Sequence, residues 1–515
     1  MSVKLPFNTS AMRLIINGFF ESHILNQVYI KVIEKFSIEK CHIFTNLGNT
    51  ARNLLQAEIK SQVNFYDFQE TITGSYSYVN WSEITPLDEA TICKMAECET
   101  LVLKMMDRLS IDSVSYEERK RLYLRHLRYW NHIILHENID LFLNGGIPHE
   151  IYDFIIYSLC RLRNIPCLFF LNSPINGVVF ISNDWEKEPA TSVAETYNQI
   201  ISQRPEKIYL SDRFRHHYDI QTSPSEDPIP WYMDSKFNPN ITKPRLPIVS
   251  LDRLFMLLKK VKKALENQQL IDKSIELIDK SIEKLVKRIQ TTRKKKLLDF
   301  YEHNTTIPDL SKEYIYVPLH YQPECSTSPM AGAFVNQILI VQMIASLIPS
   351  GIYIYVKEHP FQTPYFRDTN FYKDLLAIPQ VQLISREYNS FRLIENCLAV
   401  ATATGTAGWE ALFRQKPVLM FGHTFYQYAP SVFSIHSLQD CRDALNKIIK
   451  DNVKPSLYEM QVFLKAMETH AVIGYTDIAY SSVSQITCEE NTNNLFSALK
   501  ERIMNLGYPS TSKHN

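Results

Sequence analysis

The stretch LAVATATGTAGWEALF, residues 398–413, gives the clearest indication of the fold. Its apolar and small residues 398–403 predict a buried strand, and the segment that begins at Trp409 predicts a helix. Between them lie two of the chain's 13 glycines, Gly405 and Gly408. Small residues let a ligand approach the backbone, and the first N–H groups of a helix lack internal partners. The turn therefore predicts either a phosphate site or a strand–helix turn that is tight for packing reasons.

Strand-like and helix-like segments alternate on both sides of the middle of the chain. This alternation predicts an α/β fold with parallel sheets covered by helices. The expected strands of the first half are 13–18, 41–47, 139–146 and 165–172, with helices at 24–36 and 150–164. Those of the second half are 313–319, 352–360, 381–387, 398–403 and 416–422.

The length of 515 residues favours two domains. We expect two Rossmann-like domains with a helical insert between them. The expected divisions are 1–204 (first domain), 205–250 (linker), 251–300 (amphipathic helical insert), 301–450 (second domain) and 451–515 (C-terminal helices and a polar tail).

Composition excludes some classes of protein. Lys plus Arg and Asp plus Glu are both 55, so no overall charge attracts nucleic acid. The nine cysteines form no CxxC pair, which argues against structural zinc and favours a reducing cytosol. The start of the chain lacks the features of a signal peptide. The uncharged segment 337–356 is divided by Pro349-Ser350-Gly351, so we expect a helix, a turn and a strand there instead of a membrane span.

Polar residues follow several of the expected strands, where α/β sheets bind ligands. Lys357, His359 and Pro360 form the end of one expected strand; a fixed histidine there can donate a hydrogen bond to a phosphate or leaving group, although a lone histidine is usually structural. Gly145, Gly146, His149 and Glu150 follow another, and the carboxylate there predicts either a general base or a helix cap. Further cleft candidates are Asn17, Gly18, His320, Gln322, Glu324, Gly422 and His423.

Metal motifs are missing from the sequence. There is no HExxH and no convincing Asp-x-Asp pair, so we expect neither a metal nor a cofactor.

The expected insert carries a duplicated heptad, IDKSIEL (271–277) followed by IDKSIEK (278–284), with basic clusters at 259–263 and 287–296. This pattern predicts an amphipathic helix. Its basic face is either solvated or rests on an anionic membrane surface.

Taken together, these motifs resemble a bacterial family of capsule and surface-polysaccharide biosynthesis proteins. The resemblance rests on IPHE (147–150), YVPLHYQPECSTSP (316–329), IYVKEHP (354–360) and TATGTAGWEALFRQKPVLMFG (402–422), in that order. The family is similar to GT-B glycosyltransferases, including the capsular Kdo transferases that use CMP-activated Kdo.

The resemblance implies a GT-B-like fold, with two Rossmann-like domains facing a cleft, and roles for particular residues. It places the acceptor side in the first domain, with His149 and Glu150 as catalytic residues, and the nucleotide-sugar in the second. His359 would stabilise the leaving phosphate. The implied donor-binding residues are Lys357, His359, Pro360, Thr404, Gly405, Thr406, Ala407, Gly408 and Glu410.

The resulting expectation is a cytoplasmic glycosyltransferase that transfers a sugar, such as CMP-linked Kdo, to a capsular or lipid-linked acceptor. Contact of residues 259–296 with the inner face of the membrane is the expected mode of peripheral attachment. The alternatives are a CDP-alditol phosphotransferase, a sugar-nucleotide 2-epimerase and a non-catalytic scaffold of capsule assembly.

Overall fold

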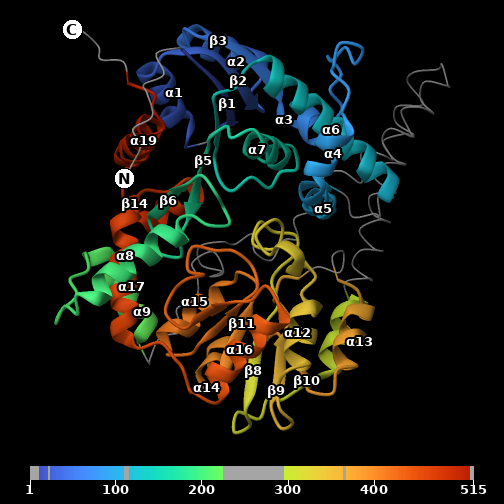
Figure 1. The fold of residues 1–515 in the computed structure, drawn as a ribbon, viewed down its shortest axis with the longest axis vertical. Helices are drawn as coiled ribbons and strands as arrows, with labels where there is room; N and C mark the ends of the chain where they lie inside the picture. The colour runs from blue at the N-terminus through green and yellow to red at the C-terminus, as the bar shows by residue number, and fades with distance from the viewer. Residues whose placement is uncertain (1–10, 21–23, 110–114, 224–294, 363–366, 511–515) are drawn as a thin grey trace, which may run out of the picture.

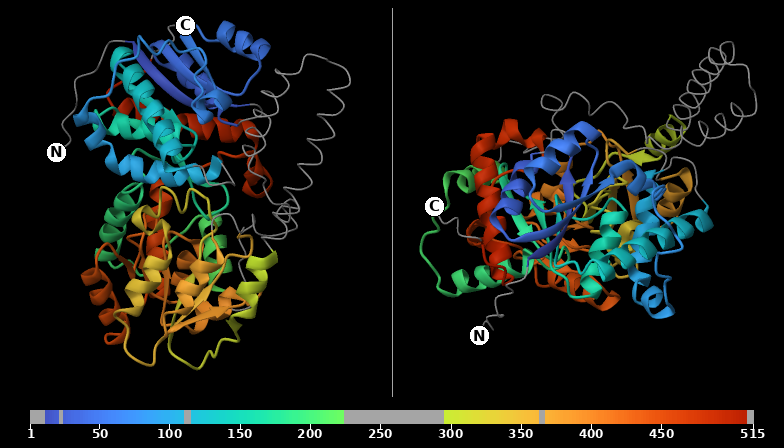
Figure 2. Two further views of the ribbon diagram at one scale, coloured as in Figure 1. Left: turned by 90° about the vertical axis from the view of Figure 1, so that its right-hand side faces the viewer. Right: turned by 90° about the horizontal axis from the view of Figure 1, so that it is seen from above.

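The computed structural model of the chain describes residues 11–20, 24–109, 115–223, 295–362 and 367–510. Each half is built on a seven-stranded sheet, and the two sheets lie one above the other in Figure 1. Both sheets are mainly parallel and have helices on their faces (Figures 1 and 2). The expected α/β class with two Rossmann-like units is confirmed.

The first sheet has the strand order β14-β6-β5-β4-β1-β2-β3. Its strands from β5 to β3 are parallel, and β6 runs antiparallel to both β5 and β14. The strands are β1 (Met12–Phe19), β2 (Ile38–Thr45), β3 (Gln62–Asp67), β4 (Leu141–Asn144), β5 (Cys167–Asn172), β6 (Val178–Ser182) and β14 (Val472–Ile473).

Two apolar layers cover this sheet. Leu14 and Ile16 point to the side of α1 and α19, whereas Ile15 and Phe44 point to the side of α5, α6 and α7. Alternation along β1 thus buries both faces, as expected for a sheet between two helix layers. The helices in chain order are α1 (Asn26–Lys35), α2 (Asn49–Glu58), α3 (Phe68–Thr73), α4 (Glu89–Lys94), α5 (Ala96–Met105), the 3-10 turn η1 (Met106–Leu109), α6 (Tyr116–His136), α7 (Tyr152–Leu162), α8 (Ala190–Ser202) and α9 (Asp212–Thr222).

The second sheet has the strand order β13-β12-β11-β8-β9-β10-β7 and is parallel throughout. Its strands are β7 (Thr305–Thr306), β8 (Tyr314–Pro318), β9 (Tyr353–Lys357), β10 (Val381–Ile384), β11 (Ala399–Thr402), β12 (Val418–Met420) and β13 (Val432–Ser434). Its helices are η3 (Gly332–Val335), α12 (Ile338–Ala345), α13 (Thr369–Leu376), α14 (Ser390–Asn396), α15 (Thr406–Phe413) and α16 (Leu438–Ile449).

The end of the described chain returns to the first sheet. Helix α17 (Leu457–His470) packs on α8, β14 joins the edge of β6, and α19 (Cys488–Asn505) packs on α1. The short η4 (Ile478–Tyr480) and α18 (Ser481–Ser484) lie between β14 and α19. Apolar contact also joins the two units, for example between the rings of Phe180 and Phe425, whose centroids are 6.4 Å apart.

All nine strands expected from the sequence are present, with ends that differ by at most three residues. Segment 337–356 forms α12, a turn and β9, as expected. Within the described residues, no helix has the length and apolar character needed to cross a membrane. The heptad segment 271–284 lies outside the described residues.

Candidate functional site

The candidate residues gather at the points where the strand order of each sheet reverses. In the first sheet β1 lies beside β4, and in the second β8 lies beside β11. A crevice forms at the carboxyl ends of such strand pairs, because the connections leave in opposite directions. The sequence places IPHE after β4 and the Thr-Gly turn after β11, so both motifs fall at these points.

The loop after β4 is held by a buried carboxylate. Asp153 Oδ2 accepts a hydrogen bond of 3.1 Å from the His149 N–H, and its Oδ1 accepts one of 2.6 Å from the Glu150 N–H. Burial raises the pKa of Asp153 to about 6, although these bonds and the His149 charge act against the rise. Asp153 therefore positions the two candidate catalytic residues.

The backbone next to Glu150 is strained. Ile151 has φ 75° and ψ −72°, a region that β-branched residues rarely occupy. The Tyr152 N–H donates to the Glu150 carbonyl at 3.0 Å, which closes a tight turn around Ile151. Such strain persists only where the surroundings hold it in place, and here Asp153 does so.

Asn17 and Asn144 face each other at the ends of β1 and β4. The Tyr152 hydroxyl donates to Asn17 Oδ1 at 2.8 Å, and Asn144 Nδ2 donates to the Gly146 carbonyl at 2.9 Å. Gly18 packs against Tyr29, which an added Cβ would approach to 2.5 Å, so a packing role accounts for this glycine. Gly145 and Gly146 are half-buried in the loop.

His320 supports the Thr-Gly turn from inside. Its Nε2 lies 2.8 Å from the Thr402 hydroxyl and accepts from the N–H groups of Ala403 and Thr404 at 3.2 and 3.4 Å. Burial lowers the pKa of His320 to about 3, so the ring is neutral and its proton lies on Nδ1. His320 therefore binds the turn itself, and the N–H groups of Ala403 and Thr404 already have His320 as their acceptor.

The glycines of this turn are needed for packing. A Cβ at Gly408 would lie 2.5 Å from the Tyr426 hydroxyl, and one at Gly405 would lie 2.9 Å from the His320 ring. At Gly422 it would meet the Met330 carbonyl at 2.6 Å. Close packing therefore accounts for glycine at these three positions.

Helix α15 presents its free end to the same region. Its N-cap is Gly405, and no side chain of the described residues caps it. The N–H groups of Thr406 and Ala407 therefore remain to bind an anion. One turn later, burial raises the pKa of Glu410 to about 7, although a hydrogen bond from Thr406 opposes this.

The segment after β9 is anchored by a buried ion pair. Glu358 pairs with Arg367, both almost fully buried, and Arg367 also donates to the His320 carbonyl. This pair links the segment to the loop after β8. His359 Nδ1 accepts from the Phe361 N–H at 3.2 Å, and burial together with Arg367 and Lys357 lowers its pKa to about 4. The neutral His359 ring therefore carries its proton on Nε2, where it can donate to an anion.

Lys357 is a buried cation beside this histidine. Its Nζ donates to the Ser390 hydroxyl at 2.7 Å, and burial lowers its pKa to about 8. No carboxylate of the described residues forms a salt bridge with it. A buried ammonium group that has no carboxylate partner favours a bound anion. Pro360 follows His359 and is exposed.

Side chains from both units meet between the two turns. Arg108 of η1 donates to the carbonyl of His149 and, at 2.7 Å, to that of Ser328. Cys325 lies close enough to His149 to raise the pKa of its ring, and the backbone carbonyl of the next residue, Ser326, accepts a hydrogen bond of 2.6 Å from the Thr404 hydroxyl. A continuous series of contacts thus runs from the loop after β4 to the loop after β11.

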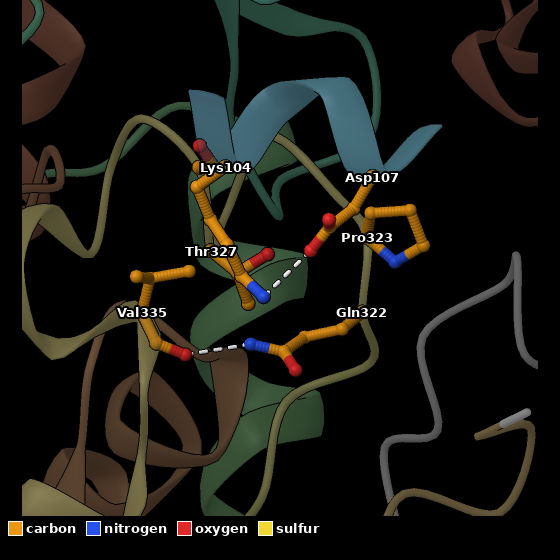
Figure 3. Close-up of a pocket in the computed structure, with 7 residues that line it drawn as sticks. Lys104, Asp107, Gln322, Pro323, Thr327 and Val335 are labelled. Atoms are coloured by element: carbon orange, nitrogen blue, oxygen red, sulfur yellow. Dashed lines mark hydrogen bonds and ion pairs between the residues drawn. The ribbon is translucent and has the colours of Figure 1, made fainter. Parts of the chain in front are cut away.

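A small, open pocket lies at this junction (Figure 3). Its walls include the Lys104–Asp107 ion pair of the first unit, with 2.6 Å between the charged atoms, and Gln322, whose Nε2 donates to the Val335 carbonyl at 2.6 Å. Glu324 lies in the same loop, near Ser326.

His423 lies apart from His359, at another contact between the units. Its ring packs at 5.6 Å from Trp185, and its Nδ1 lies 3.2 Å from Gln427 Oε1. Gln427 in turn donates to the Glu186 carbonyl at 2.6 Å. His423 therefore contributes to the junction of the units.

The sequence-based search missed three residues that organise the site. Arg108 and Asp153 act on the backbone of distant or neighbouring loops, and Cys325 meets His149 only through folding. No local motif indicates them, although an aspartate three residues after Glu150 is a capping signal. Among the described residues, no group of three or more His, Cys, Asp or Glu is arranged to hold a metal ion.

Comparison with known proteins adds one family match. Residues 328–461 match a family model described as "Capsule polysaccharide biosynthesis protein". No curated protein matches the chain.

Several solved structures are similar over most of the chain. The UDP-GlcNAc 2-epimerase of Methanocaldococcus jannaschii is 11% identical, covers 89% of this chain and 99% of its own, and has a TM-score of 0.26. KpsC of Thermosulfurimonas dismutans, a beta Kdo 2,7 transferase, is 14% identical, with coverage of 75% and 91% and a TM-score of 0.28. Alr3699/HepE of Anabaena, in complex with UDP and glucose, is 10% identical, with coverage of 96% and 99% and a TM-score of 0.26. At these low scores, the matches contribute nothing to the functional argument.

The fold and the site define a two-domain α/β protein of GT-B-like layout, with polar turns at both strand-order reversals. Residues 328–461 match the family model of capsule polysaccharide biosynthesis proteins, in agreement with the resemblance seen in the sequence.

Proposed function

We propose that this protein is a glycosyltransferase that transfers a sugar from a nucleotide donor to a capsular or surface glycan. The observation that carries the proposal is the contact between the loops that lie where the strand order of each sheet reverses. The loop with His149 and Glu150 meets the loop after β8, which in turn holds the turn with Thr404 and Gly405. An acceptor and an activated sugar phosphate need such a pair of opposed surfaces.

The donor would bind to the second unit. The positive charge of Lys357, the Nε2–H of His359 and the first N–H groups of α15 are suited to the phosphates of the donor. Glu410 is suited to the hydroxyl groups of the donor, because a carboxyl group accepts their hydrogen bonds.

The acceptor hydroxyl would bind at Glu150. Glu150 Oε1 lies 3.5 Å from His149 Nε2, and about a third of the Glu150 side chain is exposed. In the transfer, the acceptor oxygen bonds to the anomeric carbon and Glu150 takes its proton. The bond between this carbon and the phosphate oxygen breaks, and His359 donates a hydrogen bond to the oxygen that leaves.

A CMP-linked ulosonic acid such as Kdo is the donor we favour, from the family resemblance. A thermal-shift series with CMP, CDP, UDP, GDP and dTDP tests this. Binding at a hundredfold excess over Kd stabilises a protein by about 2.7 kcal/mol. A shift with CMP that is lost in His359→Ala supports the proposal, with His303→Ala as an exposed control. A shift with CDP indicates alditol-phosphate transfer. A shift with UDP indicates UDP-sugar transfer or epimerisation, and no shift with any nucleotide contradicts the proposal.

Attachment to the inner face of the membrane is a second part of the proposal. Basic residues within 259–296 are its sequence basis, because clustered Lys and Arg bind anionic lipid surfaces. This location would bring the enzyme to lipid-linked acceptors.

A further inference from the structure

We propose that Arg367 is a positioning residue of the donor site: its guanidinium group fixes the loop that carries His359 relative to the turn at the start of α15. This inference rests on the proposed function, because it assigns a role within the donor site. It extends that function by naming the residue that sets the spacing between the two phosphate-binding parts of the site.

Arg367 joins two loops with the two ends of one planar group. Its Nη1 donates to both carboxylate oxygens of Glu358, and its Nη2 donates to the backbone carbonyl of His320. The Arg367 and Glu358 side chains are each only 2% exposed. Glu358 belongs to the loop after β9 and His320 to the loop after β8. Because a guanidinium group holds two acceptors in a fixed geometry, Arg367 sets the distance between these loops.

Glu358 transmits this placement to His359. Its Oε1 accepts a hydrogen bond of 2.6 Å from the His359 N–H, and its Oε2 accepts one from the Tyr372 hydroxyl. The Glu358 N–H donates to the Tyr301 hydroxyl at 2.9 Å. The carboxylate and the backbone of Glu358 are thus held from several sides, and the backbone of His359 is held with them.

His320 transmits the placement to the turn before α15. Its backbone carbonyl is bound by Arg367, while its ring binds the hydroxyl of Thr402 and the N–H groups of Ala403 and Thr404. A shift of the His320 backbone would therefore move the acceptor that holds the turn. The free N–H groups of α15 follow directly after this turn, so their position also depends on Arg367.

A second contact keeps the same loops together. The Gln322 N–H donates to Gln362 Oε1 at 2.9 Å, and Gln362 Nε2 donates to the Gln322 carbonyl at 3.3 Å. Both side chains are buried. We therefore expect the two loops to stay in contact when Arg367 is changed, with a less defined spacing.

Spacing matters for phosphate because hydrogen bonds weaken steeply when their distance or angle is wrong. The Nε2–H of His359 and the N–H groups of α15 have to reach the oxygen atoms of one donor at the same time. Glu358 neutralises the charge of Arg367, so Arg367 acts on the donor through these groups and not by binding phosphate itself.

The test compares Arg367→Lys with Tyr372→Phe in the full-length chain. Lysine keeps a positive charge opposite Glu358, but its single ammonium group does not reproduce the planar, two-ended contact. Tyr372→Phe is the matched control, because it removes a hydrogen bond to the same carboxylate and leaves the guanidinium contacts unchanged. If Arg367→Lys does not fold, the double variant Glu358→Gln/Arg367→Gln, which buries no unpaired charge, takes its place.

Hydrogen–deuterium exchange without any ligand is the first measurement. In Arg367→Lys, the amides of segment 399–408 should exchange about tenfold faster than in the wild-type chain, because the turn loses part of its support. Exchange in this segment should be unchanged in Tyr372→Phe. If Arg367→Lys exchanges there like the wild type, or if both variants accelerate exchange equally, the proposal is wrong.

Calorimetric titration with CMP and with UDP is the second measurement. For the nucleotide that binds the wild type, Kd should rise about tenfold in Arg367→Lys and stay within about twofold in Tyr372→Phe. An unchanged Kd in Arg367→Lys would overturn the positioning role. If neither nucleotide binds the wild type, the proposed function fails, and the exchange measurement still decides whether Arg367 positions the turn.

Discussion

Asp153 Oδ1 lies 2.6 Å from the backbone nitrogen of Glu150 and accepts its N–H, while Oδ2 accepts the N–H of His149. One buried carboxylate thus fixes both candidate catalytic residues and holds Ile151 at φ 75°. This contact joins the start of α7 to the end of β4, so the fold of the first unit directly determines the geometry of the site.

Removing this carboxylate should affect activity more than stability. We expect Asp153→Ala to lower the free energy of unfolding by about 1–3 kcal/mol, because two partly buried N–H groups lose their acceptor. Glycan transfer should fall about a hundredfold, since the loop loses its geometry. Asp140→Ala is a matched control: Asp140 accepts the Arg13 N–H at 2.8 Å at the opposite end of β4. Equal loss of transfer in both variants would contradict the positioning role of Asp153.

Glu410 should make stability depend on pH. Burial raises its pKa from 4.5 to about 7, so the folded state disfavours the carboxylate. The stability of the wild-type chain therefore declines as pH rises from about 4.5 to 7, and Glu410→Gln should avoid this decline. We expect the variant to be more stable than wild type at pH 8, by up to about 3 kcal/mol, and equally stable at pH 4.5. Urea unfolding at both pH values measures this. The exposed Glu395→Gln should show no such pH-dependent gain; a gain of the same size there would refute the explanation.

The closeness of Gly408 and Tyr426 predicts a coupled pair of mutations. Gly408→Ala should destabilise the protein by about 1–3 kcal/mol, because the new Cβ would lie 2.5 Å from the Tyr426 hydroxyl. In a Tyr426→Phe background, this cost should be smaller by about 1 kcal/mol. A double-mutant cycle by thermal unfolding checks the coupling. Gly48→Ala, where an added Cβ has no atom within 4 Å, serves as the control. Additive effects would show that the clash lies elsewhere.

Arg108 should matter for transfer but not for donor binding. Its guanidinium donates to carbonyl groups of both units, whereas the proposed donor-binding residues all lie in the second unit. Arg108→Ala should therefore lower kcat about tenfold or more and leave the Kd of the nucleotide within about twofold. The exposed Arg392→Ala should alter neither quantity. A large change in nucleotide Kd would place Arg108 in the donor site instead.

Membrane attachment has its own test. Replacing Lys294, Lys295 and Lys296 with Gln should weaken binding to anionic liposomes at low salt, because each basic residue near the surface contributes about 1 kcal/mol. Sedimentation with liposomes measures it, with uncharged liposomes as the control. Unchanged binding to the anionic liposomes would remove this proposal.

The fold could be predicted well from the sequence because its signals are local. The apolar segments that form β1, β4, β8 and β11 are each followed by polar or small residues, and this order places the turns at one end of each sheet. Short strands without such a pattern, such as β7 and β14, were not predicted, because two-residue strands depend on the neighbour they pair with.

By itself, the sequence determined the two α/β units, the strand–turn–helix at 398–413 and the motifs at their strand ends, since hydrophobic periodicity and turn residues act over a few positions. Only the tertiary structure decided which loops meet. The contacts of Arg108 with Ser328, of Cys325 with His149 and of His320 with Thr402 join residues 82 to 220 positions apart. Their proximity follows from the strand order of the two sheets and from the packing between them, neither of which has a local signal in the chain.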